Sequence, residues 1–300
     1  MRYRYIKKFS KKSHYPWLPK ILLICAIIIF LFTVFYKKNE NGQGNIQTPS
    51  FSPPIQKSTT KPTPPLVKDT NQKIQQLLES SVINLPGKYA VVIKNLKKNH
   101  TYEINATDTF ASASIYKLAV MYKVYDSLDK GELQKNLELA PGLTVGKALE
   151  SMITISDNNS AILLAEKVGW AKTDTFLKNK GINGFNLTIQ DYPETTASAT
   201  AQILERIYTK TAVSRQASSE MSLLLFKQKI NDRIPRYLPK DVKVGHKTGE
   251  LDNFRHDAAI VVGKKSDYIF VFLSQTPAPA DAAENIAALS KAIYDALESD

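Results

Sequence analysis

Ser114 and Lys117 are the pair of residues in this chain best suited to nucleophilic chemistry. They stand three residues apart at the start of a predicted apolar helix over residues 114–128, so both side chains leave the same helix face. A serine hydroxyl is a poor nucleophile until a base removes its proton, and a lysine amine can be that base when burial or a nearby cation lowers its pKa. The positive end of the helix also favours a developing oxyanion. The pair therefore predicts acyl-transfer chemistry at Ser114.

The Ser-x-x-Lys spacing is weak evidence when taken alone. It recurs at Ser58 and in the segment that begins at Ser127. The alternative for Ser114 is an ordinary helix cap, with Lys117 as a surface charge. Context favours the chemical interpretation, because Ser114 follows the loop 109–113 and opens a long apolar helix.

A second candidate element, Ser156-Asp157-Asn158, falls at a break between two predicted helices, 145–153 and 157–168. Such a break can aim a hydroxyl and an amide into a cleft, where they would relay a proton to a leaving group and bind a substrate amide. The alternative is helix capping, because Ser and Asp are favoured at helix starts.

The third element is Lys247-Thr248-Gly249, which we place at the end of a predicted strand over residues 241–248. Gly249 would permit a close backbone approach by a substrate. Thr248 offers a hydroxyl, and Lys247 offers a cation for a carboxylate and for lowering the pKa of Lys117. The alternative is a strand end with a common turn.

The three elements gain weight from their order and settings: helix start, inter-helix break and strand end. This pattern resembles the signature of class A β-lactamases and penicillin-binding proteins. The resemblance spans most of residues 72–300 and is carried by FASASIYKLAVMYKVY, LTVGKALESMITISDNNSAILLAEKVGW and VGHKTGELDNFRHDAAIVVG. It implies the β-lactamase/transpeptidase-like fold, an acyl-serine intermediate, and a β-lactam or D-alanyl-peptide type of substrate.

The resemblance also implies roles for individual residues. Ser114 would be the nucleophile, Lys117 its activating base and Ser156 a proton relay. The oxyanion hole would combine the backbone N–H of Ser114 with that of Glu250 or Leu251. Lys247 would be the fourth catalytic residue and, with Thr248, would hold the substrate carboxylate. The other residues implied in substrate binding are Asn158, Gly249, Glu250 and Arg255, and no cofactor is implied.

The segment 181–198 departs from the class A pattern. Those enzymes carry a Glu-x-x-Leu-Asn run before a Thr-Thr pair, and that Glu activates the deacylating water. Here the pair is present as Thr195-Thr196 but no such run precedes it. The only acids in the segment, Asp191 and Glu194, are candidates for a water-activating base. Because turnover needs such a base, we expect Ser114 to be acylated and hydrolysis to be slow.

The histidines and their neighbours have simpler interpretations. We interpret His246 as a partly exposed strand residue, although it could tune Lys247. His256 and Asp257 look like a turn into the next strand, and Arg255 could assist carboxylate binding. Histidines at 14, 100, 246 and 256 give no metal-binding pattern.

Hydrophobic periodicity predicts an α+β domain over residues 71–300. Two strands come early, at 88–96 and 101–105, and three come late, at 241–248, 257–264 and 267–275. Together they predict a five-stranded antiparallel sheet flanked by terminal helices at 72–85 and 280–298. The helices predicted between the two groups of strands would pack as a separate, mostly helical lobe.

The N-terminal region predicts a membrane anchor followed by a linker. Residues 21–35 are uncharged and largely apolar, and seven Lys/Arg without an acid precede them. The positive-inside rule therefore predicts a single-pass span at residues 21–36, with residues 1–20 cytoplasmic and the domain outside. A cleaved signal peptide is the alternative, but no small-x-small cleavage site follows. Six prolines in residues 37–70 predict a disordered linker.

Charge distribution argues against nucleic acid as a partner. The formal charge of +12 belongs to the tail, since residues 69–300 carry 28 Lys/Arg and 27 Asp/Glu, a net of +1. The single cysteine, Cys25, lies inside the apolar run, which excludes a disulfide framework and a cysteine metal site.

Three functions remain open from the sequence. The leading one is a membrane-bound serine β-lactamase-type hydrolase, with a place in antibiotic resistance. The second is a peptidase or transpeptidase acting on peptidoglycan peptide stems. The third is a non-catalytic binding or scaffold domain. The sequence does not indicate the oligomeric state.

Overall fold

The computed structural model describes residues 70–189 and 191–299. The predicted anchor and nearly all of the predicted linker lie outside these ranges, so both stay predictions. Within the ranges described, no helix is both long and apolar enough to span a bilayer. The fold below concerns this part of the chain alone.

Five antiparallel strands form the central sheet, as predicted, in the spatial order β2-β1-β9-β8-β7. Their order explains how an early hairpin and a late meander make one sheet, because β1 pairs with β9. Strand β7 is at one edge. The bounds are Lys88–Asn95 (β1), His100–Ile104 (β2), Lys243–Leu251 (β7), Phe254–Val262 (β8) and Asp267–Gln275 (β9).

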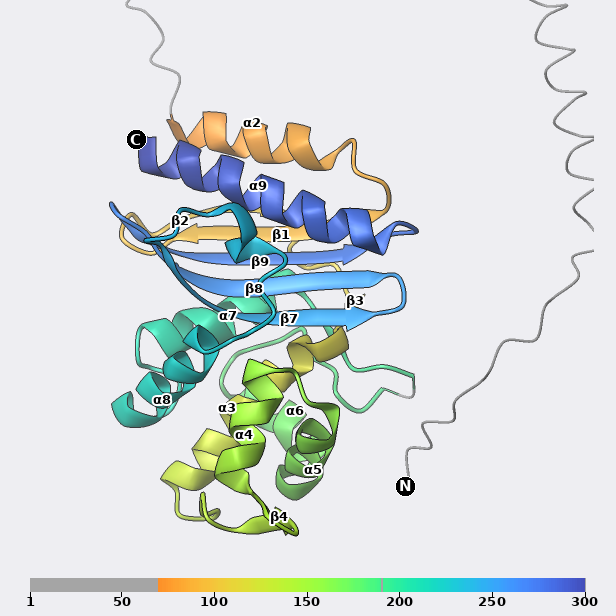
Figure 1. Ribbon diagram of the computed structural model, residues 1–300, viewed down its shortest axis with the longest axis vertical. Coiled ribbons are helices and arrows are strands. Elements are labelled where there is room, and N and C mark those ends of the chain that lie inside the picture. Colours follow the sequence, from red (N-terminus) through yellow and green to blue (C-terminus); the bar gives the residue numbers. More distant parts are fainter. Residues whose placement is uncertain (1–69, 190, 300) are drawn as a thin grey trace, which may run out of the picture. The chain divides into compact units, whose positions relative to one another are not determined.

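Helices α2 (Thr70–Val82) and α9 (Pro279–Ser299) cover one face of this sheet, as the sequence predicts (Figure 1). Alternate strand residues such as Val91 and Phe270 pack with these helices, whereas their neighbours Val92 and Val271 belong to the core on the other side. This separation follows the period of two that places successive strand residues on opposite faces. The described part of the chain therefore has two cores, one on each face of the sheet.

A mostly helical lobe occupies the other side of the sheet (Figure 1). A 3₁₀ turn, η1 (Ala113–Ile115), leads into the long buried helix of the lobe, α3 (Tyr116–Asp129). The remaining helices are α4 (Val145–Thr154), α5 (Asn158–Val168), α6 (Trp170–Asn179), α7 (Ala197–Tyr208) and α8 (Arg215–Phe226). The short elements are β3 (Phe110–Ala111), β4 (Glu138–Ala140), β5 (Leu143–Thr144), β6 (Glu194–Thr195) and η2 (Ile234–Tyr237).

Three predictions at the late strands were wrong. Lys247-Thr248-Gly249 lies inside β7 rather than at its end, because pairing with β8 continues to Leu251↔Phe254. His256 and Asp257 are not a turn but paired, fully buried residues of β8. His246 is also fully buried rather than partly exposed. In each case a polar residue is held in the sheet by a partner from a distant segment.

Candidate active site

Ser114 lies in the tight turn η1 at the start of α3. The preceding Ala113 has a φ of 46°, in the left-handed region that non-glycine residues rarely adopt. The turn is held by the N–H of Ser112, which donates to Pro193 O at 2.6 Å, and by the N–H of Ile115, which donates to Ser112 O at 2.9 Å. The Ser114 side chain is half-buried, and its hydroxyl forms no hydrogen bond within the described residues. A strained turn that presents a free hydroxyl is consistent with a functional site.

Lys117 is the first of two fully buried lysines that meet at Ser156. Its Nζ donates to Ser156 O at 2.6 Å, to Asn158 Oδ1 at 2.7 Å and to Ser156 Oγ at 3.2 Å. These three acceptors use all three protons of an ammonium group. The Lys117 side chain thus runs from α3 to the break between α4 and α5.

Lys247 reaches the same hydroxyl from β7. Its Nζ donates to Ser156 Oγ at 2.9 Å and to Thr248 O at 2.6 Å, and the side chain is completely buried. Two amines from distant elements therefore converge on one serine hydroxyl. The sequence motifs require the Ser114 hydroxyl and both amines to meet in one pocket. The hydrogen bonds to Ser156 join the two amines, and the place of the Ser114 hydroxyl in that pocket stays a prediction.

The Ser156-Asp157-Asn158 element combines capping with site chemistry. Asp157 caps α5, where its Oδ1 accepts from the N–H of Ser160 at 2.7 Å. Ser156 has a φ of 59° and is again in the left-handed region. Because the middle residue does the capping, the side chains of Ser156 and Asn158 on either side of it are directed to Lys117. The capping interpretation is therefore confirmed for Asp157, and the roles of Ser156 and Asn158 in catalysis and substrate binding stay predictions.

Burial lowers the pKa of both lysines. Removal from water brings the pKa of Lys117 down to about 8, opposed in part by the nearby Asp157 carboxylate. Burial also holds the pKa of Lys247 well below its ordinary value, with the charge of Lys117 acting in the same direction. Neither lysine forms an ion pair with a described carboxylate. The two lysines, which are linked through Ser156 Oγ, therefore carry one positive charge between them more easily than two.

Gly249 brings the β7 strand against the Ser114 turn. A Cβ placed on Gly249 would lie 3.1 Å from Ile115 Cγ1 and 3.1 Å from His256 Cβ. Contacts of that length leave no room for a side chain. The sequence interpretation reserved this space for a substrate, but two side chains of the chain itself fill it. The close packing holds η1 beside β7.

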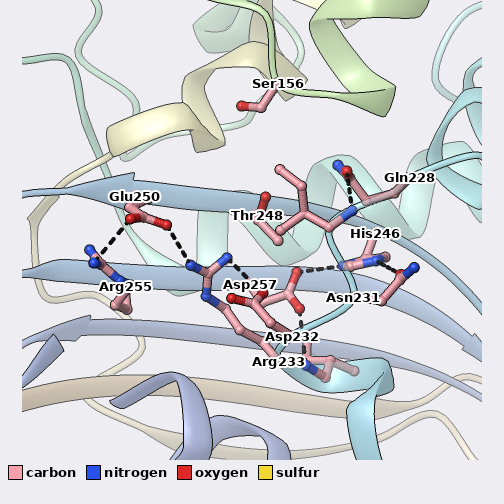
Figure 2. Close-up of polar contacts among 12 residues, drawn as sticks. Ser156, Gln228, Asn231, Asp232, Arg233, His246, Thr248, Glu250, Arg255 and Asp257 are labelled. Carbon is pink, nitrogen blue, oxygen red and sulfur yellow. Dashed lines mark hydrogen bonds and ion pairs between the residues drawn. The ribbon is translucent and has the colours of Figure 1, made fainter. Parts of the chain in front are cut away.

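Beyond Gly249, a charged network surrounds Glu250. Its carboxylate binds Arg255 at 3.0 Å and Arg233 at 3.0 Å, as Figure 2 shows. Arg233 is 1% exposed, and its Nε and Nη1 make no hydrogen bond within the described residues. The predicted residues Glu250 and Arg255 are thus brought together. Arg233 was missed, because a lone arginine between a helix and a strand predicts only a solvated loop.

A second polar cluster consists of the fully buried His246 and Asp257 and the exposed Asn231 (Figure 2). The His246 Nδ1–H donates to Asp257 Oδ1 at 2.9 Å, and Nε2 lies 3.0 Å from Asn231 Oδ1. Asp257 Oδ2 accepts from the N–H of Ile234 at 3.1 Å, so it also anchors the segment that carries Arg233. This cluster fixes η2 to the sheet.

The two loop acids are not connected to the lysines. Glu194 is half-buried and Asp191 is exposed. Neither carboxylate forms a hydrogen bond or an ion pair with Ser114, Lys117 or Ser156. Backbone bonds between Asn186 and Glu194 in both directions close the loop into a short bend. These contacts give no support to either acid as a water-activating base.

The fold and the lysine-serine site together define a class of protein, the β-lactamase-like serine hydrolases. Residues 69–297 match the model of the β-lactamase enzyme family. Because that match covers most of the chain, the protein belongs to this family, as the motif resemblance predicted.

Individual relatives agree with this assignment. β-Lactamase BRO-1 of Moraxella catarrhalis is 28% identical over 147 residues, which are 44% of this chain and 47% of the relative. The chain thus spans about half the length of this curated relative in the match. A class A β-lactamase from Bacteroides cellulosilyticus DSM 14838 superposes with a TM-score of 0.70 at 24% identity, over 77% of this chain and 99% of that one. A mutant of PBP-A, solved as an acyl-enzyme complex with penicillin G, gives 0.70 at 19% identity over 78% and 98%. These structural likenesses establish the fold.

Proposed function

We propose that this protein forms an acyl-enzyme on Ser114 with β-lactams or related D-alanyl amides and hydrolyses it slowly. The observation that carries the proposal is the convergence of Lys117 and Lys247 on Ser156 Oγ, at 3.2 and 2.9 Å. Burying two amines that form no ion pair with a carboxylate lowers the stability of the folded protein. Chemistry at the adjacent Ser114 supplies a reason for keeping them.

Acylation would begin with transfer of the Ser114 hydroxyl proton to the neutral amine of Lys117. The Ser114 oxygen then attacks the amide carbonyl, and the oxyanion is held by the N–H of Ser114 and that of Glu250 or Leu251. Ser156 accepts the proton from Lys117 while passing its own to the leaving nitrogen, after which the C–N bond breaks. The proton balance closes without a cofactor or a metal.

Substrate binding would use the groups around the edge of β7. A substrate carboxylate would lie near Lys247 and Thr248, and Arg255 and Glu250 would border it. Such an anion favours the protonated form of Lys247. Because Ser156 Oγ links the two amines, this shift would leave Lys117 as the neutral amine that acylation requires. Asn158 would contact the acylamide side chain, in addition to holding Lys117.

Deacylation is where we expect the reaction to slow. A water molecule needs a base to attack the ester, and neither Asp191 nor Glu194 contacts the lysine-serine site. We therefore expect a long-lived acyl-enzyme. The fold is compatible with such a species, since the PBP-A mutant with the same fold was solved as an acyl-enzyme complex with penicillin G.

A second candidate function is peptidase or transpeptidase action on peptidoglycan stems. It is favoured by the position of β7 at the edge of the sheet, because an edge strand is where an extended peptide can add to a sheet. A non-catalytic scaffold is the weakest candidate, because it gives no reason to bury Lys117 and Lys247 together.

The deciding experiment combines intact-mass spectrometry with two turnover assays. Wild-type protein mixed with a penicillin should gain the mass of one whole penicillin, and Ser114→Ala should gain none. Chromogenic cephalosporin turnover would then favour the hydrolase, and release of D-alanine from a stem peptide would favour the peptidase. No adduct on the wild type, or an equal adduct on Ser114→Ala, would refute the proposal.

We also propose that residues 21–36 anchor the protein in a membrane with the domain outside the cytoplasm. The proposal rests on the uncharged run and the basic residues before it. Full-length protein should stay with membranes after alkaline carbonate washing, and external protease should release the domain from spheroplasts. Recovery of full-length protein in the soluble fraction would contradict this.

A further inference from the structure

His256 is a fully buried residue of β8 whose two ring nitrogens are both engaged. The N–H of Ser274 donates to Nδ1 at 3.1 Å, so Nδ1 must carry a lone pair. The proton is therefore on Nε2, which donates to Ala111 O at 2.9 Å. Burial lowers the pKa of His256 to about 4, in keeping with a neutral ring at physiological pH. The ring bridges β9 to β3.

The bridge ends next to both parts of the proposed oxyanion hole. Ala111 is three residues before Ser114. The two residues between them are Ser112 and Ala113, and Ala113 already belongs to the η1 turn. On the other side, His256 is paired across the sheet with Gly249, the residue before Glu250. A Cβ on Gly249 would meet the ring at 3.1 Å. One imidazole thus touches the two segments that carry the candidate oxyanion donors.

The packing around the ring leaves it a single orientation. Phe110 and Phe254 meet it edge to face, with ring centroids 6.2 and 5.9 Å from it. Both nitrogens are used and the ring has no exposed surface. His256 therefore has no free atom with which to act on a substrate as an acid or base.

We propose that His256 is a positioning residue that sets the spacing between the backbone N–H of Ser114 and the N–H donors that follow Gly249. The hydrogen bond from its Nε2–H to Ala111 O fixes the segment that leads into the Ser114 turn. The contact of its ring with Gly249 fixes the position of β7 relative to that segment. The inference rests on the proposed function, because the spacing matters only if an oxyanion forms there. An oxyanion donor displaced by a fraction of an ångström loses much of its effect on the transition state.

Two substitutions separate this role from general packing. In His256→Gln the side-chain amide nitrogen can take the place of Nε2 and keep the bond to Ala111 O. In His256→Asn the side chain is one bond shorter and cannot reach it. Ile286→Ala is the control: this buried residue of α9 packs on the opposite face of the sheet, so its loss lowers stability without contacting the site.

Each variant would be examined by acylation kinetics with a penicillin and by hydrogen exchange of the amides at 112–115. We expect His256→Asn to acylate at least thirtyfold more slowly, with noncovalent affinity within threefold of wild type and faster amide exchange. His256→Gln should be within fivefold of wild type in rate, with normal exchange. Ile286→Ala should acylate normally at a temperature where it is folded.

Equal losses in the Asn and Gln variants, or a loss in Ile286→Ala as large as in His256→Asn, would overturn the inference and reduce His256 to a packing residue. If the wild type forms no adduct, the proposed function fails. Amide exchange then still tests whether His256 holds the Ser114 turn. Faster exchange in His256→Asn alone would still support the tie to the Ser114 turn, whereas unchanged exchange would refute it.

Discussion

Two polar clusters lie on opposite faces of the sheet, and they are built on different principles. The lysine cluster, Lys117, Ser156 and Lys247, is on the helical-lobe face, because Lys247 pairs with Ala258 of that core. The histidine cluster, His246, Asp257 and Asn231, is on the α2/α9 face, because His246 pairs with Ala259 of the other core.

The clusters differ in how charge is matched. In the histidine cluster a carboxylate accepts from a ring N–H and from the N–H of Ile234, so buried donors meet a buried acceptor with negative charge. In the lysine cluster two amines donate to neutral oxygens and form no ion pair with a described carboxylate, although the more distant Asp157 and Asp257 charges partly oppose the lowering of their pKa values. Matched polar groups give a fold stability and uniqueness, whereas unmatched ones are tolerated where chemistry uses them. We therefore propose a structural role for the histidine cluster and a reactive role for the lysine cluster.

The largest stability effect should come from the histidine cluster. Asp257→Ala removes the acceptor of two buried donors and should lower the free energy of unfolding by about 3–5 kcal/mol. Denaturant unfolding measures this loss. The exposed neighbour Asp232 is the comparison: its one ion pair is to Arg233 at 3.4 Å, so Asp232→Ala should lower the free energy of unfolding by about 1 kcal/mol or less. A loss under about 1 kcal/mol for Asp257→Ala would remove the contrast between the clusters.

The lysine cluster should respond to pH instead. Lys117 accepts a proton only as a neutral amine, and its pKa is lowered to about 8. Acylation should therefore rise about tenfold per pH unit below 8 and level off above it. The folded protein releases this proton at lower pH than the unfolded chain, whose lysine has the ordinary value of 10.5. The contribution of Lys117 to stability should thus rise with pH between about 8 and 10.5. Acylation that is constant from pH 6 to 9 would contradict this assignment.

A smaller effect should come from the contact between β7 and the Ser114 turn. Gly249→Ala inserts a Cβ at 3.1 Å from Ile115 and His256, which costs about 1–3 kcal/mol of stability if neither neighbour yields. The displaced turn should also slow acylation. Gly131 is the control, since a Cβ there meets nothing within 4 Å and only its φ of 73° opposes alanine. Equal acylation rates in the two variants would show that Gly249 does not position the turn.

Strong periodicity made the fold predictable. The continuous apolar run of β9 is typical of a strand buried on both faces, and α2 and α9 have helical repeats, so the five-stranded sheet and its covering helices followed from the sequence. The three motif elements also gave the convergence of Lys117 and Lys247, because each motif carries its own local setting.

The errors fell where tertiary partners override local preference. Gly249 was interpreted as the end of a strand, yet the strand continues because β7 stays paired with β8 as far as Leu251↔Phe254. His256 and Asp257 were interpreted as a turn, but Ala111 O and the N–H of Ile234 satisfy them inside the sheet. Those partners lie 145 and 23 residues away. Arg233 has no local signal at all, since its partner Glu250 is known only from the fold.

The most direct test of the contrast between the two clusters is Lys117→Met. Its acylation by a penicillin and its free energy of unfolding would both be measured on one preparation. We predict that acylation by a penicillin falls at least about a thousandfold, because the catalytic base is lost. We also predict that the free energy of unfolding changes by less than about 1 kcal/mol or increases, because an unmatched buried amine is replaced by an apolar chain of similar size. Retained acylation together with a loss of several kcal/mol would contradict both predictions, since Lys117 would then be a structural residue like Asp257.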